Sequence, residues 1–335
     1  MSQAAARQQL APFGLGQVRC GGGRRTEQPG GRRVVHRQGE GAHGGGAQRR
    51  IGVGQRCGQR RAQRPLPGGV EGDDRGGHRD LRSPADAVAH QQLAQLVPIH
   101  PGTLPAPGYG SAMRPIVLVH GAWHGPWCWA KVAAGLQAAG ATVVAPELPL
   151  RAGPGVDAAV VRDVVAGLDG AVVLGHSYGG VVISAACAGL VDVAHLVYLC
   201  AFQLAEDETT ATVLGAFPNR MAECMRFEGD ERTIGDEHLV ELFYGDCDEA
   251  DVAIARRSLR PMPAVAPPLP PYRPAWRDVP STYVVCEGDG AIPPAAQRMM
   301  AQRAGGVRTW DTSHSPFFSR PELVVDLLVA LASDR

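Results

Sequence analysis

From residue 113 onward, the sequence predicts an α/β domain with a mostly parallel central sheet and helices on both faces. Short apolar segments alternate there with stretches of helical periodicity. The apolar segments are continuous runs of Val, Ile and Leu, which is typical of parallel strands buried on both faces. A serine flanked by glycines directly follows one such segment and opens a helical stretch. Residues 113–335 are therefore expected to fold as one domain.

Six apolar segments are the expected strands, namely residues 115–120, 142–146, 171–175, 195–200, 281–286 and 307–311. The helices between them are expected from apolar residues at helical spacing. Such stripes run through residues 129–136 and 160–168. The run after Ser177 is small and apolar all round, so it is expected to be the most buried helix, and residues 322–333 form the last one.

Residues 202–279 interrupt this alternation with a long insertion. Helices are expected near residues 236–244 and 248–260, and seven prolines follow between residues 261 and 274. Met, Phe and Leu side chains in this segment supply apolar surface suited to covering a pocket. We therefore expect a helical lid, and a linker without structure is the alternative.

Residues 1–112 differ in composition from the rest of the chain. They hold 16 Arg against 7 acidic residues, a net charge of +9, with 23 of the 43 glycines and two aromatic residues. Such a stretch buries too little apolar surface to offset the entropy of ordering it, so a disordered extension is expected. A nucleic-acid-binding arm is the alternative, but Gln and acids interrupt the basic charge and residues 14–79 contain no aromatic side chain for base stacking.

The codon usage behind this composition suggests a second hypothesis. Lys131 is the only lysine in the chain, so nearly all basic residues are Arg, as in proteins encoded by GC-rich DNA. Upstream reading frames often stay open in such DNA, and Met113 stands two residues before the first convincing strand. We therefore hypothesise that the functional protein begins at Met113.

The remaining composition excludes several protein classes. No run of about 18 apolar residues occurs, and the N-terminus lacks the pattern of a secretion signal. The eight cysteines are scattered without a CxxC pair, which is typical of core residues in a reducing compartment rather than of disulfides or a zinc site. We expect a cytoplasmic monomer or homodimer without a metal, a cofactor, or a membrane or nucleic-acid partner.

The strongest motif is Gly175-His176-Ser177-Tyr178-Gly179, a GxSxG sequence between a strand and a helix. The backbone at such a sharp turn is crowded, and glycines two residues before and after the serine remove Cβ atoms that would clash. The turn exposes the serine Oγ, and the N–H groups of the following helix favour developing negative charge. Ser177 is therefore the candidate nucleophile.

A serine nucleophile needs a base, and the base needs a carboxylate that orients it. His314 lies between the last strand and the last helix, and Asp289 follows the strand at residues 281–286. Both lie in loops at the carboxyl ends of strands, where sites form in such sheets. We expect His314 as the base and Asp289 as the acid, with Glu287 and Asp311 as alternative acids near strand ends.

Attack on a carbonyl forms an oxyanion, which needs two N–H donors. The backbone N–H of Tyr178, directly after the serine, is one candidate, and that of Ala122, in the loop after the first strand, is the other. Near these loops, Trp123, Trp127 and Phe317 predict an apolar or aromatic substrate pocket. Core packing is the alternative role for these three side chains.

Four segments, in this order, resemble the α/β-hydrolase superfamily: IVLVHGAWHGPWCW, LGHSYGG, YVVCEGDGAIPPAAQRM and DTSHSPFFSRPEL. More narrowly, they resemble the group that includes plant methylsalicylate and methyl jasmonate esterases, plant hydroxynitrile lyases and bacterial esterase relatives. The resemblance covers residues 113–335. It implies a triad of Ser177, His314 and Asp289, with the same two oxyanion donors, under a helical lid.

The resemblance also bears on the type of reaction. The plant lyases carry Thr at the position of Gly121 and Lys directly after the base, where this chain has Ser315. Without that lysine, no positive charge faces a departing cyanide. We expect a serine hydrolase that cleaves small, apolar or aromatic carboxylic esters through an acyl-enzyme. Lyase-like or amidase activity on the same triad, or a ligand-binding receptor with slow turnover, are the alternatives.

Overall fold

The computed structural model describes residues 113–334, and the predicted disordered extension, residues 1–112, lies outside the described residues. A six-stranded sheet in the order β2-β1-β3-β4-β8-β9 has every neighbouring pair parallel. Its strands are β1 (Ile116–Val119), β2 (Val143–Val144), β3 (Ala171–His176), β4 (Val193–Leu199), β8 (Ser281–Cys286) and β9 (Gly306–Trp310). The predicted parallel sheet is confirmed, and the strand ends differ from the predicted ones by at most two residues.

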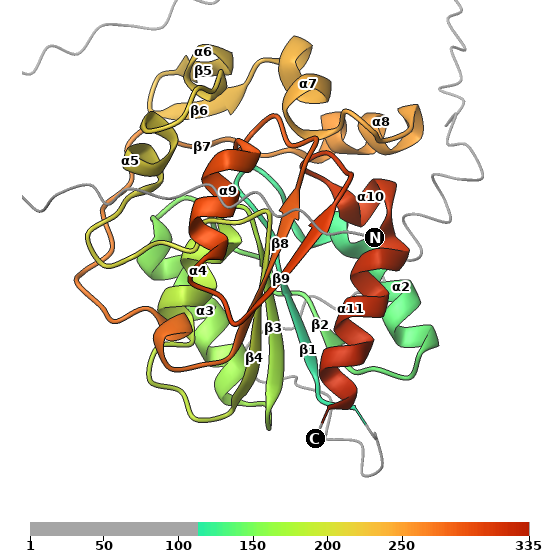
Figure 1. The fold of residues 1–335 in the computed structure, drawn as a ribbon. Helices are drawn as coiled ribbons and strands as arrows, with labels where there is room; N and C mark the ends of the chain where they lie inside the picture. The colour runs from blue at the N-terminus through green and yellow to red at the C-terminus, as the bar shows by residue number, and fades with distance from the viewer. Residues whose placement is uncertain (1–112, 335) are drawn as a thin grey trace, which may run out of the picture. The chain divides into compact units, whose positions relative to one another are not determined.

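Helices cover both faces of this sheet (Figure 1). α2 packs on α11 on one face, and α3 packs on α4 on the other. The helices are η1 (Pro126–Trp129), α2 (Ala130–Ala138), α3 (Pro154–Ala166), α4 (Gly179–Ala186), α9 (Pro294–Ala301), α10 (Pro316–Ser319) and α11 (Pro321–Ser333). α4 buries seven of its eight residues, which confirms the prediction for the helix after the serine. Within residues 113–334, every helix is too short or too polar to cross a membrane.

The strand register aligns the loops that carry the site. All four residues of β1 and all six of β3 are buried, and burial of each Val, Ile or Leu side chain stabilises the fold by about 1.5–3 kcal/mol. Val119 pairs with Gly175, and His176 pairs with Leu199. The carboxyl ends of β1, β3 and β4 therefore lie at the same edge of the sheet. β8 follows β4 in the sheet and β9 follows β8, so their loops leave this edge as well.

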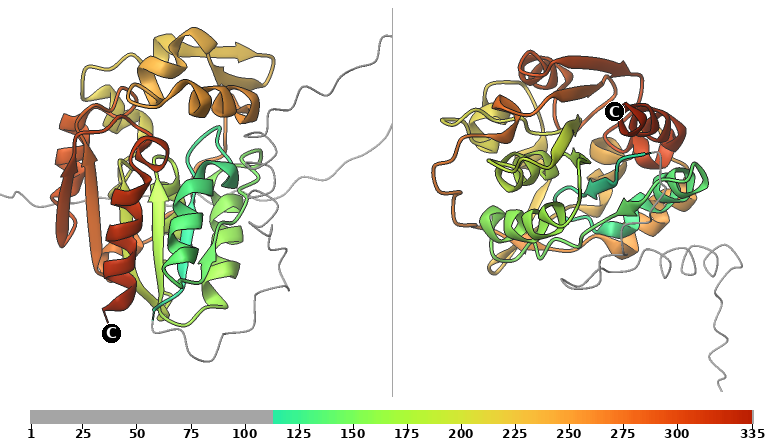
Figure 2. Two further views of the ribbon diagram at one scale, coloured as in Figure 1. Left: turned by 90° about the vertical axis from the view of Figure 1, so that its right-hand side faces the viewer. Right: turned by 90° about the horizontal axis from the view of Figure 1, so that it is seen from below.

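Most of the insertion lies over the carboxyl ends of the strands (Figures 1 and 2), whereas its last residues, 276–279, lie at the amino ends of β4, β8 and β9. Its helices are α5 (Thr210–Gly215), α6 (Met221–Cys224), η2 (Asp236–His238), α7 (Leu239–Phe243), α8 (Glu249–Ser258) and η3 (Ala275–Arg277). The two helices predicted in this segment are present, the first as η2 followed by α7 and the second as α8.

The insertion also contains a small antiparallel sheet that the sequence did not predict. Its strands are β5 (Met225–Glu228), β6 (Glu231–Ile234) and β7 (Met262–Pro263). These strands are short and carry charged side chains, so they lack the apolar pattern of the main sheet. The turn Gly229-Asp230 is the one local signal of a hairpin, with Gly229 at a φ of 58°.

Candidate active site

Ser177 stands at the turn from β3 to α4 with a φ of 53°, a left-handed conformation that residues other than glycine rarely adopt. The surrounding backbone leaves no room for side chains on the flanking glycines. A Cβ on Gly175 would lie 2.6 Å from Gly179 O, and a Cβ on Gly179 would lie 2.6 Å from Val119 O. The Ser177 N–H donates to Leu199 O over 3.3 Å. The strained serine is thus held by close backbone packing on both sides.

Asp289 and His314 are in direct contact. His314 Nδ1 donates to Asp289 Oδ2 over 2.6 Å, and both side chains are buried. Because the carboxylate only accepts, Nδ1 carries the hydrogen and Nε2 is the basic nitrogen. The Ser177 hydroxyl makes no hydrogen bond within residues 113–334, and such contacts often tighten only when substrate binds.

The two alternative acids lie elsewhere. Glu287 pairs with Arg298 over 2.6 Å at the surface. Asp311 is exposed and does not pair with His314. Of the three acids considered from the sequence, Asp289 is the one that contacts the histidine.

The Asp289 carboxylate accepts four hydrogen bonds. Ala291 N–H and Ile292 N–H donate to Oδ1 over 2.7 and 2.9 Å. Gln297 Nε2 and His314 Nδ1 donate to Oδ2 over 2.7 and 2.6 Å. An ionised carboxylate has about four lone-pair sites, so these four donors satisfy it. They therefore hold the carboxylate in one orientation towards the imidazole.

Gln297 is a site residue that the sequence analysis missed. It projects from α9, is fully buried, and its Oε1 accepts from Cys286 N–H over 2.9 Å. Its Nε2 also donates to Ile292 O over 2.7 Å, so all three partners agree on the orientation of the amide. A glutamine among the apolar residues of a short helix was the only local signal, and it matches no motif.

Two backbone N–H groups at the site have no acceptor. Neither Ala122 N–H nor Tyr178 N–H donates a hydrogen bond to any described residue. His120 Nδ1 donates to Gly121 O over 3.0 Å. Because a trans peptide group is planar, this bond directs the Ala122 N–H the opposite way. The Tyr178 hydroxyl donates to the buried Asp157 of α3 over 2.7 Å, which holds the Tyr178 side chain in place.

The loop after β1, residues 120–125, is named the β1 loop. Two buried histidines, His120 and His124, belong to it, and a third, His176, packs beside it. Burial lowers the pKa of His120 to about 3 and that of His124 to about 4. Burial also lowers the pKa of His176 well below its ordinary value. His176 Nε2 donates to His314 O over 2.9 Å, so this neutral ring positions the loop of His314. All three imidazole rings thus make hydrogen bonds to backbone groups.

One group of side chains has the spacing of a metal site. The candidate ligand atoms of His176, Cys200 and His314 lie within 4.8 Å of one another, a proximity that the sequence did not reveal. Burial raises the pKa of the Cys200 thiol well above its ordinary value, and this thiol donates to His314 O over 3.4 Å. Metal binding requires the thiolate, so we assign no metal to this group.

Trp123 lines a cavity of about 170 Å³ between the β1 loop and the insertion. The other apolar lining residues, Ile234, Leu239 and Leu259, all come from the insertion. The Trp123 backbone has a φ of 62°, so its conformation is strained like that of Ser177.

The other two predicted pocket residues pack against the site rather than line this cavity. The Trp127 ring stacks on His124 with 5.4 Å between ring centroids. Phe317 is fully buried, with ring centroids 5.1 Å from Trp129 and 4.9 Å from His176. Trp127 therefore packs against His124, and Phe317 packs against His176.

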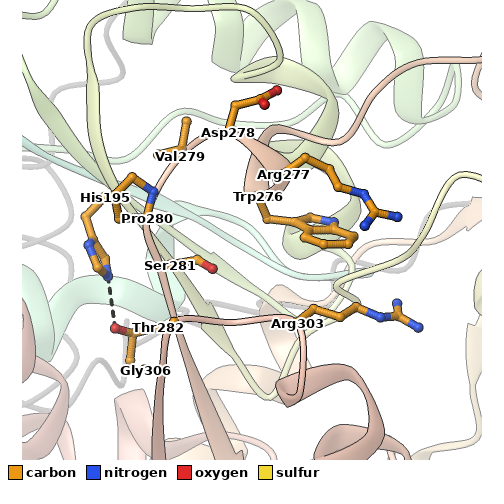
Figure 3. Close-up of a pocket in the computed structure, with 11 residues that line it drawn as sticks. His195, Trp276, Arg277, Asp278, Val279, Pro280, Ser281, Thr282, Arg303 and Gly306 are labelled. Carbon is orange, nitrogen blue, oxygen red and sulfur yellow. Dashed lines mark hydrogen bonds between the residues drawn. The ribbon is translucent and has the colours of Figure 1, made fainter.

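A larger hollow of about 550 Å³ lies at the opposite, amino ends of β4, β8 and β9 (Figure 3). Trp276 lies there between Arg277 and Arg303. Both arginines are already paired, with Glu206 over 2.7 Å and with Glu208 over 2.6 Å. The hollow thus presents no free charge to a ligand.

Comparison with known proteins agrees with this geometry. The sequence pattern of the α/β hydrolase family matches residues 116–327. A pyrethroid hydrolase of Sphingobium wenxiniae is 30% identical over 245 residues, which are 65% of this chain and 87% of that protein. Methylesterase 7 of Arabidopsis thaliana is 29% identical over 263 residues, 65% of this chain and 96% of that protein.

Solved structures show the same fold. A pyrethroid hydrolase from Sphingobium faniae, 25% identical, superimposes with a TM-score of 0.56 over 66% of this chain and 98% of its own. Polyneuridine aldehyde esterase, 20% identical, superimposes with a TM-score of 0.58 over 65% of this chain and 99% of its own. Because the family pattern spans more than half of the sequence, the chain belongs to the α/β hydrolase family, as the resemblance predicted.

Proposed function

We propose that this protein is a serine esterase that cleaves small, apolar or aromatic carboxylic esters. The observation that carries the proposal is the buried hydrogen bond between His314 and Asp289, at the sheet edge where Ser177 adopts its strained turn. Similarity to proteins named methylesterase and pyrethroid hydrolase supports hydrolytic chemistry.

The first half-reaction forms an acyl-enzyme. Ser177 Oγ attacks the ester carbonyl while His314 Nε2 accepts the hydroxyl proton, and Asp289 stabilises the resulting imidazolium. The carbonyl oxygen becomes an oxyanion that accepts from Ala122 N–H and Tyr178 N–H, the two groups without another acceptor. The carbon–alkoxide bond then breaks, and His314 returns the proton to the leaving alcohol.

The second half-reaction repeats this chemistry with water. His314 Nε2 removes a proton from water, the hydroxide attacks the acyl carbonyl, and the same two N–H groups hold the oxyanion. Collapse of this intermediate breaks the bond to Ser177 Oγ, which takes the proton back from His314. The products are one carboxylic acid and one alcohol, and neither half-reaction needs a metal or cofactor.

The cavity beside Trp123 supports a small substrate. Its volume of about 170 Å³ suits a short acyl or alkoxy group, and its apolar side chains alternate with the polar or charged Thr233, Asp236, Arg256 and Arg260. Most of its lining comes from the insertion, residues 202–279, which we propose acts as a lid over the bound ester.

Two features favour hydrolysis over cyanohydrin cleavage. A Cβ on Gly121 would lie 2.9 Å from His176 Nδ1 and 3.0 Å from Ser177 Cβ, so the threonine of the lyases does not fit without movement. Ser315, which follows the base, is fully buried and supplies no positive charge for a departing anion.

The test is hydrolysis of p-nitrophenyl esters from acetate to octanoate by the full chain and by its Ser177→Ala variant. We expect turnover that disappears in the variant while its melting temperature stays unchanged, with a preference for the shorter esters. Turnover that persists in the folded variant would exclude Ser177 as the nucleophile. A folded wild-type protein that cleaves none of these esters would refute the proposal.

A further inference from the structure

We propose that Arg260, in the insertion, is a positioning residue for the oxyanion hole. This inference rests on the proposed function, because it concerns how the Ala122 N–H is held for catalysis. Arg260 comes directly after Leu259, the residue that caps the C-terminus of α8. The sequence analysis assigned it no role. Its contacts connect the insertion with the β1 loop.

Arg260 binds the β1 loop through both backbone and side chain. Its N–H donates to Trp123 O over 2.7 Å. Its Nη2 donates to His124 O over 2.9 Å and to Leu148 O over 3.1 Å. Its Nη1 pairs with Glu147 over 2.7 Å, which holds the guanidinium in place. One residue thus holds two successive carbonyls of the loop.

Two further residues of the insertion hold the same loop. The Tyr244 hydroxyl donates to His124 Nε2 over 2.9 Å, and the Trp123 indole N–H donates to Arg232 O over 3.1 Å. With its Nε2 accepting, His124 uses Nδ1–H to donate to Ala122 O over 2.7 Å. The insertion therefore reaches Ala122 itself through the His124 ring.

These bonds determine the direction of the catalytic N–H. Ala122 lies between two peptide planes, one held at Gly121 O by His120 and the other at Ala122 O by His124. The next residue, Trp123, has a strained φ of 62°, which persists only if the surroundings hold it. Loss of the Arg260 side chain removes the bonds to His124 O and Leu148 O, so the loop and the Ala122 N–H become less ordered.

The consequence is a coupling between the insertion and the transition state. Ser177 and His314 are buried, and the ring of Phe243 in the insertion lies 5.5 Å from the His314 ring, so we infer that the insertion moves when substrate enters. Movement of Arg260 away from the β1 loop then releases the loop carbonyls. The oxyanion hole is then complete only when the insertion is closed over the ester. The same closure therefore excludes water and stabilises the transition state.

The experiment compares Arg260→Met and Arg260→Lys with a matched control, Arg151→Met, all in the full chain. Arg151 also joins the body of the domain to the insertion, through Glu231 over 2.7 Å, but it does not contact the β1 loop. Three quantities are measured: kcat and KM for the best p-nitrophenyl ester, the inhibition constant of a trifluoromethyl ketone that forms a tetrahedral oxyanion, and amide hydrogen exchange of residues 116–129.

We expect Arg260→Met to lower kcat by about 10- to 100-fold, since a misplacement of about 1 Å can cost on the order of 100-fold. Arg260 also lines the cavity beside Trp123, so KM should rise as well, but by less than kcat falls. Ketone inhibition should weaken by the same factor as kcat/KM, because both report binding of the tetrahedral state. Exchange of the β1 loop should become faster. The Arg260→Lys variant should give values between those of Arg260→Met and wild type in each measurement. The Arg151→Met variant should match wild type in all of them.

Two results would overturn the inference. One is a folded Arg260→Met variant whose kcat and loop exchange match wild type. The other is a loss confined to KM, or shared equally by Arg151→Met, which would indicate general loosening of the insertion. If Arg260→Met does not fold, Arg260→Lys carries the same comparison. Failure of the proposed function is separate, because it appears as wild-type turnover that does not depend on Ser177, while the exchange measurement still tests Arg260.

Discussion

The two ends of the parallel sheet each carry a histidine and a hydroxyl side chain, but with different surroundings. At the amino end, His195 Nε2 lies 2.9 Å from Thr282 Oγ1, beside the larger hollow. Thr282 belongs to a regular strand, and no carboxylate contacts His195 within residues 113–334. At the carboxyl end, Ser177 is strained, His314 is oriented by Asp289, and two N–H groups are free. The amino end thus has the larger hollow, whereas the carboxyl end has the histidine–carboxylate pair on which the proposed function rests.

The largest expected effect removes the orienting acid from the carboxyl end. Asp289→Asn should lower kcat by about 10⁴-fold, because the amide favours the wrong imidazole tautomer. Steady-state kinetics with p-nitrophenyl butyrate measures this loss. Glu287→Gln, two residues earlier in the same loop, should keep wild-type activity, and an equal loss in both variants would contradict the assignment.

Weakening the support of that acid should cost less. Gln297→Met keeps the volume but removes one donor to Asp289 Oδ2, and a hydrogen bond to a charged group contributes about 1.5–3 kcal/mol, so we expect a 10- to 100-fold loss in kcat. The low-field proton NMR signal of His314 Nδ1–H should shift as well. The exposed Gln302→Met serves as control. Lower activity with an unchanged proton signal would indicate a purely structural role.

The histidines at the carboxyl end should make stability depend on pH. The folded state lowers the pKa of His120 and His124 to about 3 and about 4, whereas the unfolded chain binds protons near 6.5. The contribution of these histidines to the free energy of unfolding is thus fully present above pH 6.5. It falls as the pH drops from 6.5 towards 4, by about 1.4 kcal/mol per pH unit for each histidine. Urea unfolding at several pH values measures this slope.

A substitution at each end of the sheet sharpens that measurement. His120→Gln should flatten the slope, since it removes one of the groups that take up a proton on unfolding. His195→Gln should flatten it less, because His195 is only partly buried and its pKa is lowered less. Equal slopes in wild type and His120→Gln would contradict the assignment.

The smallest effect is expected at the amino end. Thr282→Val removes the hydroxyl next to His195 and should leave kcat/KM within about twofold of wild type, as for substitutions far from the reacting atoms. The same ester assay measures it. A large loss there would mean that the hollow takes part in the reaction, and the contrast between the two ends would fail.

Much of the fold was predictable because it depends on local patterns. Short apolar segments identified all six strands of the main sheet, although β9 is largely exposed. Helical stripes identified α2 and α3, and runs of small or apolar residues identified α4 and α11. The hairpin of β5 and β6 was missed because its charged, exposed residues carry no burial pattern. Local periodicity reports burial, so it identifies elements of the core better than elements of an insertion.

The site was predicted in part for the same reason. Ser177 has a local motif, and Asp289 and His314 follow strands whose carboxyl ends meet at one edge. The local sequence did not decide which of Asp289, Glu287 and Asp311 contacts the histidine. In the structure, the neighbouring loops after β8 and β9 bring Asp289 to His314, and its role as the acid stays a prediction.

The sequence by itself determined the strands, the glycines of the tight turn and the loops that carry the reactive side chains, because each follows from residues near one another in the chain. Only the tertiary structure decided that Gln297 supports Asp289 and that Arg260 holds the β1 loop. Both roles depend on the direction of one side chain towards its partners. Arg260 and His124 are 136 residues apart, so no local pattern records that they meet. Such contacts arise only when packing brings distant elements together.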